Sequence, residues 1–209
     1  MSSLRLLIPR KALGEAKSRL AAHLGDEPRR RLVEALLAGV LDAARRCPAV
    51  AEIWVLSPTR PPLPGGVRWL PDRGRDLNDA LARALGRLVP DSPLPLAVVA
   101  GDLPLLAPAD LAALAAGVAA GAVVLAPDRR GEGTNALALP AGVSMRPCFG
   151  PGSLWLHRAE AARQGRGVRL LRRPGLAFDL DRVQDLAELI ALHPHPWRTA
   201  LGPEWTARP

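Results

Sequence analysis

Short apolar runs that alternate with amphipathic helical patterns constrain this chain more than any other feature of its sequence. Residues 4–8 are apolar apart from Arg5, and residues 94–100 form a second apolar run that stops at Gly101. Runs of this kind are typical of strands buried on both faces of a sheet. Between them, residues 27–46 have apolar side chains at helical spacing and arginines on the opposite face, which predicts a helix.

The same alternation continues along the rest of the chain. Further strands are expected at 52–56, 67–70, 122–126, 135–139, 168–171 and 176–180. Further helices are expected at 76–89, 108–118, 153–163 and 183–192, the first capped by Asp76 and the second with Pro108 in its first turn. This order predicts an α/β fold with a mainly parallel or mixed sheet and helices on both faces. We expect one domain over residues 1–192 and a tail over 193–209 without a clear period.

The net positive charge of the chain suggests a nucleic-acid-binding protein as one possible class. Lys and Arg number 28 against 20 Asp and Glu, a formal net charge of +8, and a basic surface is the footprint of phosphate binding. The basic residues are scattered, however, and with no Tyr and two Phe the chain offers few side chains on which single-stranded bases could stack. We therefore expect no nucleic-acid partner, and an Arg-rich nucleic-acid-binding protein is the weakest alternative.

The sequence gives little indication of a membrane segment, of disulfide bonds or of a site that contains histidine. The sequence has no run of 18 or more apolar residues and no charged leader with a cleavage site, so we expect a cytoplasmic protein without a membrane partner. Cys47 and Cys148 are too few for a disulfide framework. The histidines, at 23, 157, 193 and 195, lack partners at metal-ligand spacing apart from the HPH of the tail. None of these side chains is assigned to a functional site.

The loop after the first strand contains both lysines of the chain, Lys11 and Lys17, followed by Ser18 and Arg19. Two ammonium groups, a guanidinium and the amides of a turn could cradle a polyphosphate and offset the charge of a leaving pyrophosphate. We expect Lys17 and Arg19 to act in catalysis and all four residues to bind a nucleotide. The loop lacks the phosphate-loop pattern G-x-x-x-x-G-K-[ST], and a solvated basic loop is the alternative.

Three carboxylates follow apolar segments. Asp102 comes directly after the run at 94–100, and Asp179 and Asp181 stand two apart, so that on an extended chain both would face one site. Neighbouring carboxylates favour a cation between them, and the three together suit Mg²⁺. We expect all three to bind the metal and Asp102 to act in catalysis as well. The alternatives are a turn or cap role for Asp102 and a cap of the following helix for Asp181.

Two loops of small residues offer a site for a second anion. Thr134 in GEGTNAL, and Gly150 and Ser153 in FGPGS, could present hydroxyls and amides to a phosphate or carboxylate. Ordinary turns, with Ser153 as a helix cap, are the alternative. Asn78 has the donor and acceptor needed to read a base or ribose, although an Asn near a helix start is usually a cap.

Taken in order, these motifs resemble the guanylyltransferases of coenzyme F(420) biosynthesis, which activate 2-phospho-L-lactate, phosphoenolpyruvate or 3-phospho-D-glycerate. The matching stretches are IPRKALGEAKSRL (8–20), AGDLPLL (100–106), APDRRGEGTNAL (126–137), FGPGS (149–153) and PGLAFDLDRVQDL (174–186), together with Asn78. Their joint order is far more specific than any single motif. The chain departs from the family pattern at Arg10 and at Arg75-Asp76, which affects the details of nucleotide binding.

The resemblance implies a nucleotide-diphospho-sugar transferase-like fold with GTP as donor and Mg²⁺ on the three carboxylates. It further implies that Lys17 and Arg19 lie along the GTP phosphates and that the small-residue loops hold the acceptor. The acceptor phosphate would attack the α-phosphorus, pyrophosphate would leave, and the product would pass to a deazaflavin transferase. Which of the three acids is used stays open. Another nucleotidyltransferase of this fold, with a molybdopterin or sugar-phosphate acceptor, is the alternative.

Overall fold

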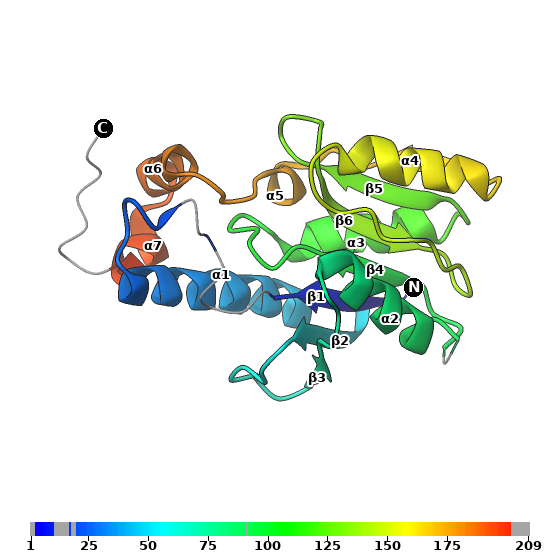
Figure 1. Cartoon of the computed structure of the whole chain (residues 1–209), viewed down its shortest axis with the longest axis horizontal. Helices are drawn as coiled ribbons and strands as arrows, with labels where there is room; N and C mark the ends of the chain where they lie inside the picture. Colours follow the sequence, from blue (N-terminus) through cyan, green and yellow to red (C-terminus); the bar gives the residue numbers. More distant parts are fainter. Residues whose placement is uncertain (1–2, 11–16, 18–19, 91, 202–209) are drawn as a thin grey trace.

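A computed structural model of the chain describes residues 3–10, 17, 20–90 and 92–201 (Figure 1). The strands are β1 (Leu4–Pro9), β2 (Val50–Ser57), β3 (Val67–Pro71), β4 (Leu96–Val99), β5 (Val123–Pro127), β6 (Thr134–Leu139) and β7 (Val168–Leu170). The helices are α1 (Asp26–Arg46), α2 (Leu77–Leu88), α3 (Pro108–Val118), α4 (Ser153–Arg163), α5 (Pro174–Ala177), α6 (Val183–Leu192) and α7 (Pro194–Leu201). None of the described helices is both long and apolar enough to cross a membrane.

The strands form one seven-stranded mixed sheet in the order β3-β2-β1-β4-β6-β5-β7. β1 pairs in parallel with β2 and β4, whereas β6 runs antiparallel to β4 and to β5. Val99 at the end of β4 pairs with Ala136, and Pro127 at the end of β5 pairs with Thr134. The beginning of β6 therefore lies at the same edge of the sheet as the ends of β4 and β5.

The alternation of side chains along the strands divides the core between the two faces of the sheet. Leu6 and Ile8 of β1 pack in one cluster with residues of α1 and α3. Leu7 packs in a second cluster with residues of α2 and α4. The predicted α/β fold, a mixed sheet covered by helices on both faces, is thus confirmed.

The segment 176–180 was expected to be a strand, and this prediction is wrong. Residues Pro174–Ala177 form the single turn α5, begun by a proline at its first position, and an extended connection follows. The carbonyls of Leu176 and Ala177 accept hydrogen bonds from the Asn135 side chain, at 3.0 and 3.2 Å. A short apolar run does not distinguish a strand from a buried helical turn. Here the carbonyls of Leu176 and Ala177 bond to the Asn135 side chain and not to a neighbouring strand.

The residues after 193 were expected to be a tail without a clear period, and part of this segment forms α7. Arg31 of α1 donates from Nε to the Ala200 carbonyl at 3.1 Å, and Trp197 is buried. Trp197 packs in a third cluster with residues of α1 and α6, including Leu32 and Leu189. Figure 1 shows α7 beside the first turns of α1.

Candidate active site

An ammonium group joins two of the carboxylates singled out from the sequence. Lys17 Nζ forms an ion pair with Asp102 and donates a 3.0 Å hydrogen bond to Asp181 Oδ1. Its side chain is only 7% exposed, and its backbone has a φ of +56°, a left-handed conformation that is uncommon outside glycine. The fold therefore brings the first loop, the end of β4 and the segment before α6 to one place.

Backbone and amide contacts hold the segment of Asp179 and Asp181 against the end of β4. The Leu180 N–H donates to the Asp102 carbonyl at 3.3 Å, and Asn135 Nδ2 approaches Asp179 Oδ1 at 3.4 Å. Because these contacts link three elements, the i, i+2 pair of carboxylates is fixed relative to Asp102.

The N-cap residue of α6 is Arg182, and the side chain that satisfies its backbone N–H is that of Asp185 in the first turn, not that of Asp181. Asp185 Oδ2 accepts from the Asp181 and Arg182 N–H groups at 2.9 and 2.7 Å. The carboxylate of Asp181 instead faces Lys17. Asp102 likewise lies in a turn after β4, and its side chain pairs with Lys17. The structure thus excludes the helix-cap alternative for Asp181 and gives the Asp102 carboxylate an electrostatic partner.

The charges of this cluster are coupled. Burial raises the pKa of the Asp179 carboxyl above its ordinary value, and the negative charges of Asp102 and Asp181 raise it further. Burial lowers the pKa of the Lys17 ammonium, but the same two carboxylates outweigh it, so that pKa lies above its ordinary value. Lys17 is therefore cationic at neutral pH and offsets the charges of Asp102 and Asp181, while the Arg129 guanidinium interacts with Asp179.

The donors fit a hard divalent cation by charge and by type. All three side chains offer oxygen, the ligand that Mg²⁺ prefers, and the ammonium of Lys17 already occupies a cation position between Asp102 and Asp181. Within the described part of the chain, no three acidic, His or Cys side chains converge closely enough to hold a metal as they stand. Mg²⁺ is commonly held by one or two carboxylates together with water and substrate phosphates, so three converging side chains are not needed.

A cavity of about 500 Å³ lies next to the carboxylates. It brings together the predicted acceptor residues Thr134, Gly150 and Ser153 with Asp179 and Asp181. The other lining residues are Asp128, Arg129, Arg130, Glu132, Gly133, Asn135, Pro151, Gly152, Arg182 and Asp185. The lining carries five acidic side chains and three arginines, so an anion here would be bound by the arginines and by the hydroxyls and amides of the loops, not by an overall positive charge.

The FGPGS loop enters α4 through two glycines with positive φ. Gly150 has a φ of +124° and Gly152 a φ of +68°, conformations that favour glycine. The Ser153 N–H donates to the Gly150 carbonyl at 3.1 Å, and the Leu154 N–H donates to the Glu132 carbonyl at 3.1 Å. The loop is therefore tied to the 128–134 loop beside it.

Asn78 holds this loop from the other side. Its Nδ2 donates to the Phe149 carbonyl at 3.0 Å, and its Oδ1 accepts from the Phe149 N–H at 2.7 Å. The cap of α2 is Asp76, which accepts from the Asp79 N–H at 2.9 Å, as predicted. Asn78 is therefore not the cap, and both ends of its amide contact the loop, whereas the sequence predicted that it reads the nucleotide.

Three functional candidates were missed in the sequence. Asn135 connects β6 to Asp179, and Arg129 lines the cavity while its guanidinium pairs with Asp185 and with Glu188, the latter at 2.7 Å. His157 is fully buried behind Thr134. Asn135 and Arg129 stand in motifs that the sequence did single out, but no spacing marks His157. Lys11, Ser18 and Arg19, the remaining predicted nucleotide residues, lie outside the described residues.

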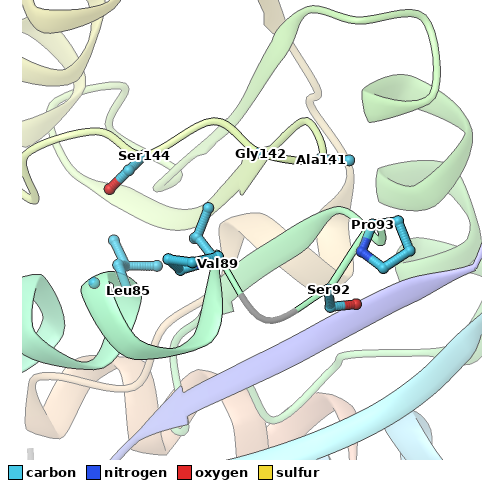
Figure 2. A pocket seen from close by; sticks show the side chains of 9 residues that line it. Leu85, Val89, Ser92, Pro93, Ala141, Gly142 and Ser144 are labelled. Carbon is cyan, nitrogen blue, oxygen red and sulfur yellow. The ribbon is translucent and has the colours of Figure 1, made fainter.

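A second cavity, of about 590 Å³, lies at the opposite edge of the sheet (Figure 2). Its walls come from the end of α2 and from the turn after β6, including Leu85, Val89, Pro93 and Ala141. Its described lining contains no charged side chain. It therefore lacks the carboxylates and arginines of the first cavity, although Ser92 and Ser144 contribute hydroxyls.

A family model described as "Guanylyl transferase CofC like" matches residues 4–199. The chain belongs to this family. A relative from Chloroflexus aggregans named phosphoenolpyruvate guanylyltransferase is 41% identical over 194 residues, 89% of this chain and 96% of the relative. One from Phenylobacterium zucineum named 3-phospho-D-glycerate guanylyltransferase is 37% identical over 203 residues, 93% and 92% of the two chains.

The fold of this family member is also found in a solved structure. The crystal structure of a protein classed as a nucleotide-diphospho-sugar transferase from Desulfovibrio desulfuricans G20 has a TM-score of 0.79. The match covers 96% of this chain and 93% of that one, at 16% identity. At this identity the likeness supports the fold alone, which agrees with the predicted nucleotide-diphospho-sugar transferase-like architecture.

Proposed function

We propose that this protein transfers a guanylyl group from GTP to the phosphate of a small phosphorylated carboxylic acid and releases pyrophosphate. The observation that supports this most directly is the 500 Å³ cavity in which Thr134, Gly150 and Ser153 lie beside Asp179 and Asp181. Family membership supplies the guanylyl donor, and the relatives' names supply the class of acceptor. Phosphoenolpyruvate is the first acceptor to test, with 3-phospho-D-glycerate and 2-phospho-L-lactate beside it.

The carboxylate cluster would hold Mg²⁺ through Asp102, Asp179 and Asp181. When bound, the ion would supply positive charge that offsets the reacting phosphates. Lys17 provides a second positive charge at the same point, because its ammonium lies between Asp102 and Asp181. Together with Lys11, Ser18 and Arg19 of the same loop, it would balance the charge on the departing pyrophosphate.

The acceptor would lie in the cavity with its anionic groups against the loops at 134 and 150–153. Its phosphate is already ionised near neutral pH, so an oxygen can attack the α-phosphorus without a strong general base. A bond forms between that oxygen and the α-phosphorus. The bond between the α-phosphorus and the oxygen that bridges to the β-phosphorus breaks, and pyrophosphate leaves. The product is an acid linked to GMP through a diphosphate bridge, a group activated for transfer to a deazaflavin acceptor in coenzyme F(420) biosynthesis.

Asn78 contributes to this site through the loop that it holds. Since both ends of its amide contact the Phe149 backbone, its proposed role is to position Gly150 and Ser153 for the acceptor.

The test is pyrophosphate release from GTP and Mg²⁺ with each of the three acids offered separately. Asp102→Asn removes one carboxylate charge and is expected to lower kcat by at least about 100-fold, the size of effect typical for a charge-stabilising group. Asp42→Asn is the matched control, because Asp42 is exposed on α1 and pairs only with Arg46 among the residues described. Release that needs no acid, or that survives in Asp102→Asn, would contradict the proposal.

A further inference from the structure

A buried histidine lies directly behind the proposed acceptor cavity. His157, on α4, has no exposed surface, and its ring packs edge-on against Phe149 with centroids 4.8 Å apart. Neither the sequence patterns nor the mechanism above gives it a role. It nevertheless contacts both loops that form the cavity, through its two ring nitrogens.

The partner of Nε2 fixes the position of the ring proton. The Cys148 backbone N–H points at His157 Nε2 at 3.0 Å, and a backbone N–H can only donate. Nε2 must therefore be the unprotonated nitrogen. Burial lowers the pKa of His157 to about 4, so the ring is neutral near pH 7 and its single proton is on Nδ1.

The partner of Nδ1 is the hydroxyl of Thr134, at 3.1 Å. Since Nδ1 carries the proton, the Thr134 oxygen accepts from the ring. No acceptor within the described part of the chain takes the hydroxyl hydrogen of Thr134, which lines the cavity. That hydrogen is consequently free to point at a bound anion.

We infer that His157 is a positioning residue that makes the Thr134 hydroxyl a fixed donor to an anionic group of the acceptor. The chain of donors runs from Cys148 N–H to Nε2, and from Nδ1–H through the Thr134 hydroxyl to the acceptor. This inference rests on the proposed function, because it assigns the cavity to the acceptor. It explains why a histidine is buried where no proton transfer is needed: a neutral ring with a fixed tautomer determines the direction of the bond.

Two substitutions separate the two halves of this chain of donors. The amide of His157→Asn can take the place of Nδ1 and still donate to Thr134, whereas that of His157→Gln can take the place of Nε2 and accept from Cys148. With phosphoenolpyruvate as probe, we expect His157→Gln to raise the acceptor KM about 3- to 10-fold, the value of one hydrogen bond, with the GTP KM unchanged. His157→Asn is expected to stay within about 2-fold of the wild type, a difference well below that of one hydrogen bond. The reverse order of the two variants would overturn the inference.

A double-mutant cycle tests whether His157 acts through Thr134. Thr134→Val removes the hydroxyl, and adding His157→Gln to it is expected to raise the acceptor KM no further. Additive effects would show that the histidine acts only as a structural residue.

The tautomer can be measured in the wild-type protein without any assay. Nitrogen-15 NMR of the histidine rings is expected to show His157 with the proton on Nδ1 from pH 8 to pH 6. A proton on Nε2 would overturn the inference whether or not the protein is a guanylyltransferase. Conversely, an Nδ1–H tautomer in a protein that releases no pyrophosphate with any acid would count against the proposed function while leaving the direction of the Thr134 bond intact.

Discussion

The ammonium of Lys17 lies 3.0 Å from the carboxylate of Asp181, a residue 164 positions further along the chain. This contact joins the first loop of the fold to one of its last connections. Among the residues that the structure describes, the ammonium of Lys17 is the cation that contacts two of the proposed metal ligands, Asp102 and Asp181.

Replacing Lys17 by Arg is expected to lower kcat severely, by about 100-fold, because a planar guanidinium cannot replace a compact ammonium between two carboxylates. The measurement is pyrophosphate release with GTP and phosphoenolpyruvate. Arg46→Lys, an exposed change on α1, is the control for the loss or gain of a lysine. Full activity in Lys17→Arg would show that only the charge at this position matters.

Removal of Mg²⁺ with EDTA is expected to stop pyrophosphate release, and added Mg²⁺ to restore it. In Asp179→Asn the Mg²⁺ concentration that gives half of maximal activity should rise about tenfold or more, because one of three anionic donors is lost. A titration of activity against free Mg²⁺ measures this. An unchanged half-maximal concentration would remove Asp179 from the proposed ligands.

The amide of Asn78 offers a test between two roles. If it positions the FGPGS loop through Phe149, Asn78→Ala should raise the acceptor KM about 3- to 30-fold, since two hydrogen bonds are lost, and leave the GTP KM unchanged. If Asn78 instead reads the nucleotide, as its sequence context predicted, the GTP KM should rise. Steady-state kinetics with each substrate varied in turn distinguishes the two.

Gly175 is expected to tolerate no side chain. A Cβ there would overlap Asp110 Oδ2 and lie 2.7 Å from the Leu105 carbonyl oxygen, so Gly175→Ala should lower the free energy of unfolding by about 1–3 kcal/mol. Gly86→Ala is the control, because an added Cβ meets nothing within 4 Å and alanine favours the α2 helix. Urea denaturation measures both, and equal stability of the two variants would contradict the prediction.

His157 should make stability depend on pH. The pKa of His157 is about 4 in the folded protein and 6.5 in the unfolded chain. As the pH falls below about 6.5, the unfolded chain takes up this proton before the folded protein does. The free energy of unfolding therefore decreases between about pH 6.5 and pH 4. The full loss from this one group is roughly 3 kcal/mol. His157→Asn, which does not titrate, should lack this part of the pH dependence when unfolding is followed between pH 7 and pH 4. Parallel curves for the two proteins would refute it.

The site residues in loops after strands could be predicted from the sequence. An apolar run predicts a strand, and the residues after it are expected at the edge of the sheet where the strands end. Asp102 was found in this way, and Thr134 in the loop after the strand predicted at 122–126. In the structure Thr134 begins β6, whose antiparallel direction places it at the same edge of the sheet as the end of β4. The tie between Asn135 and Leu176 could not be predicted, because it joins residues 41 apart through a side chain. The same tie explains why 176–180 is not a strand.

His157 was missed for a related reason. Its partners Thr134 and Cys148 lie 23 and 9 residues away, spacings that no helix or strand period relates. A single buried histidine on a helix is otherwise typical of core packing. Only the coordinates show that each ring nitrogen faces one of the two loops.

The reversed direction of β6 has a consequence for how the two substrates are separated along the chain. β1 ends just before the first loop and β4 just before Asp102, whereas β6 begins at this edge of the sheet and leads away from it. Most of the proposed acceptor contacts thus fall within residues 128–153, between the end of β5 and the start of α4. Under the proposed function, a change of acid can be made inside one continuous stretch of sequence while the first loop, the proposed nucleotide site, stays as it is.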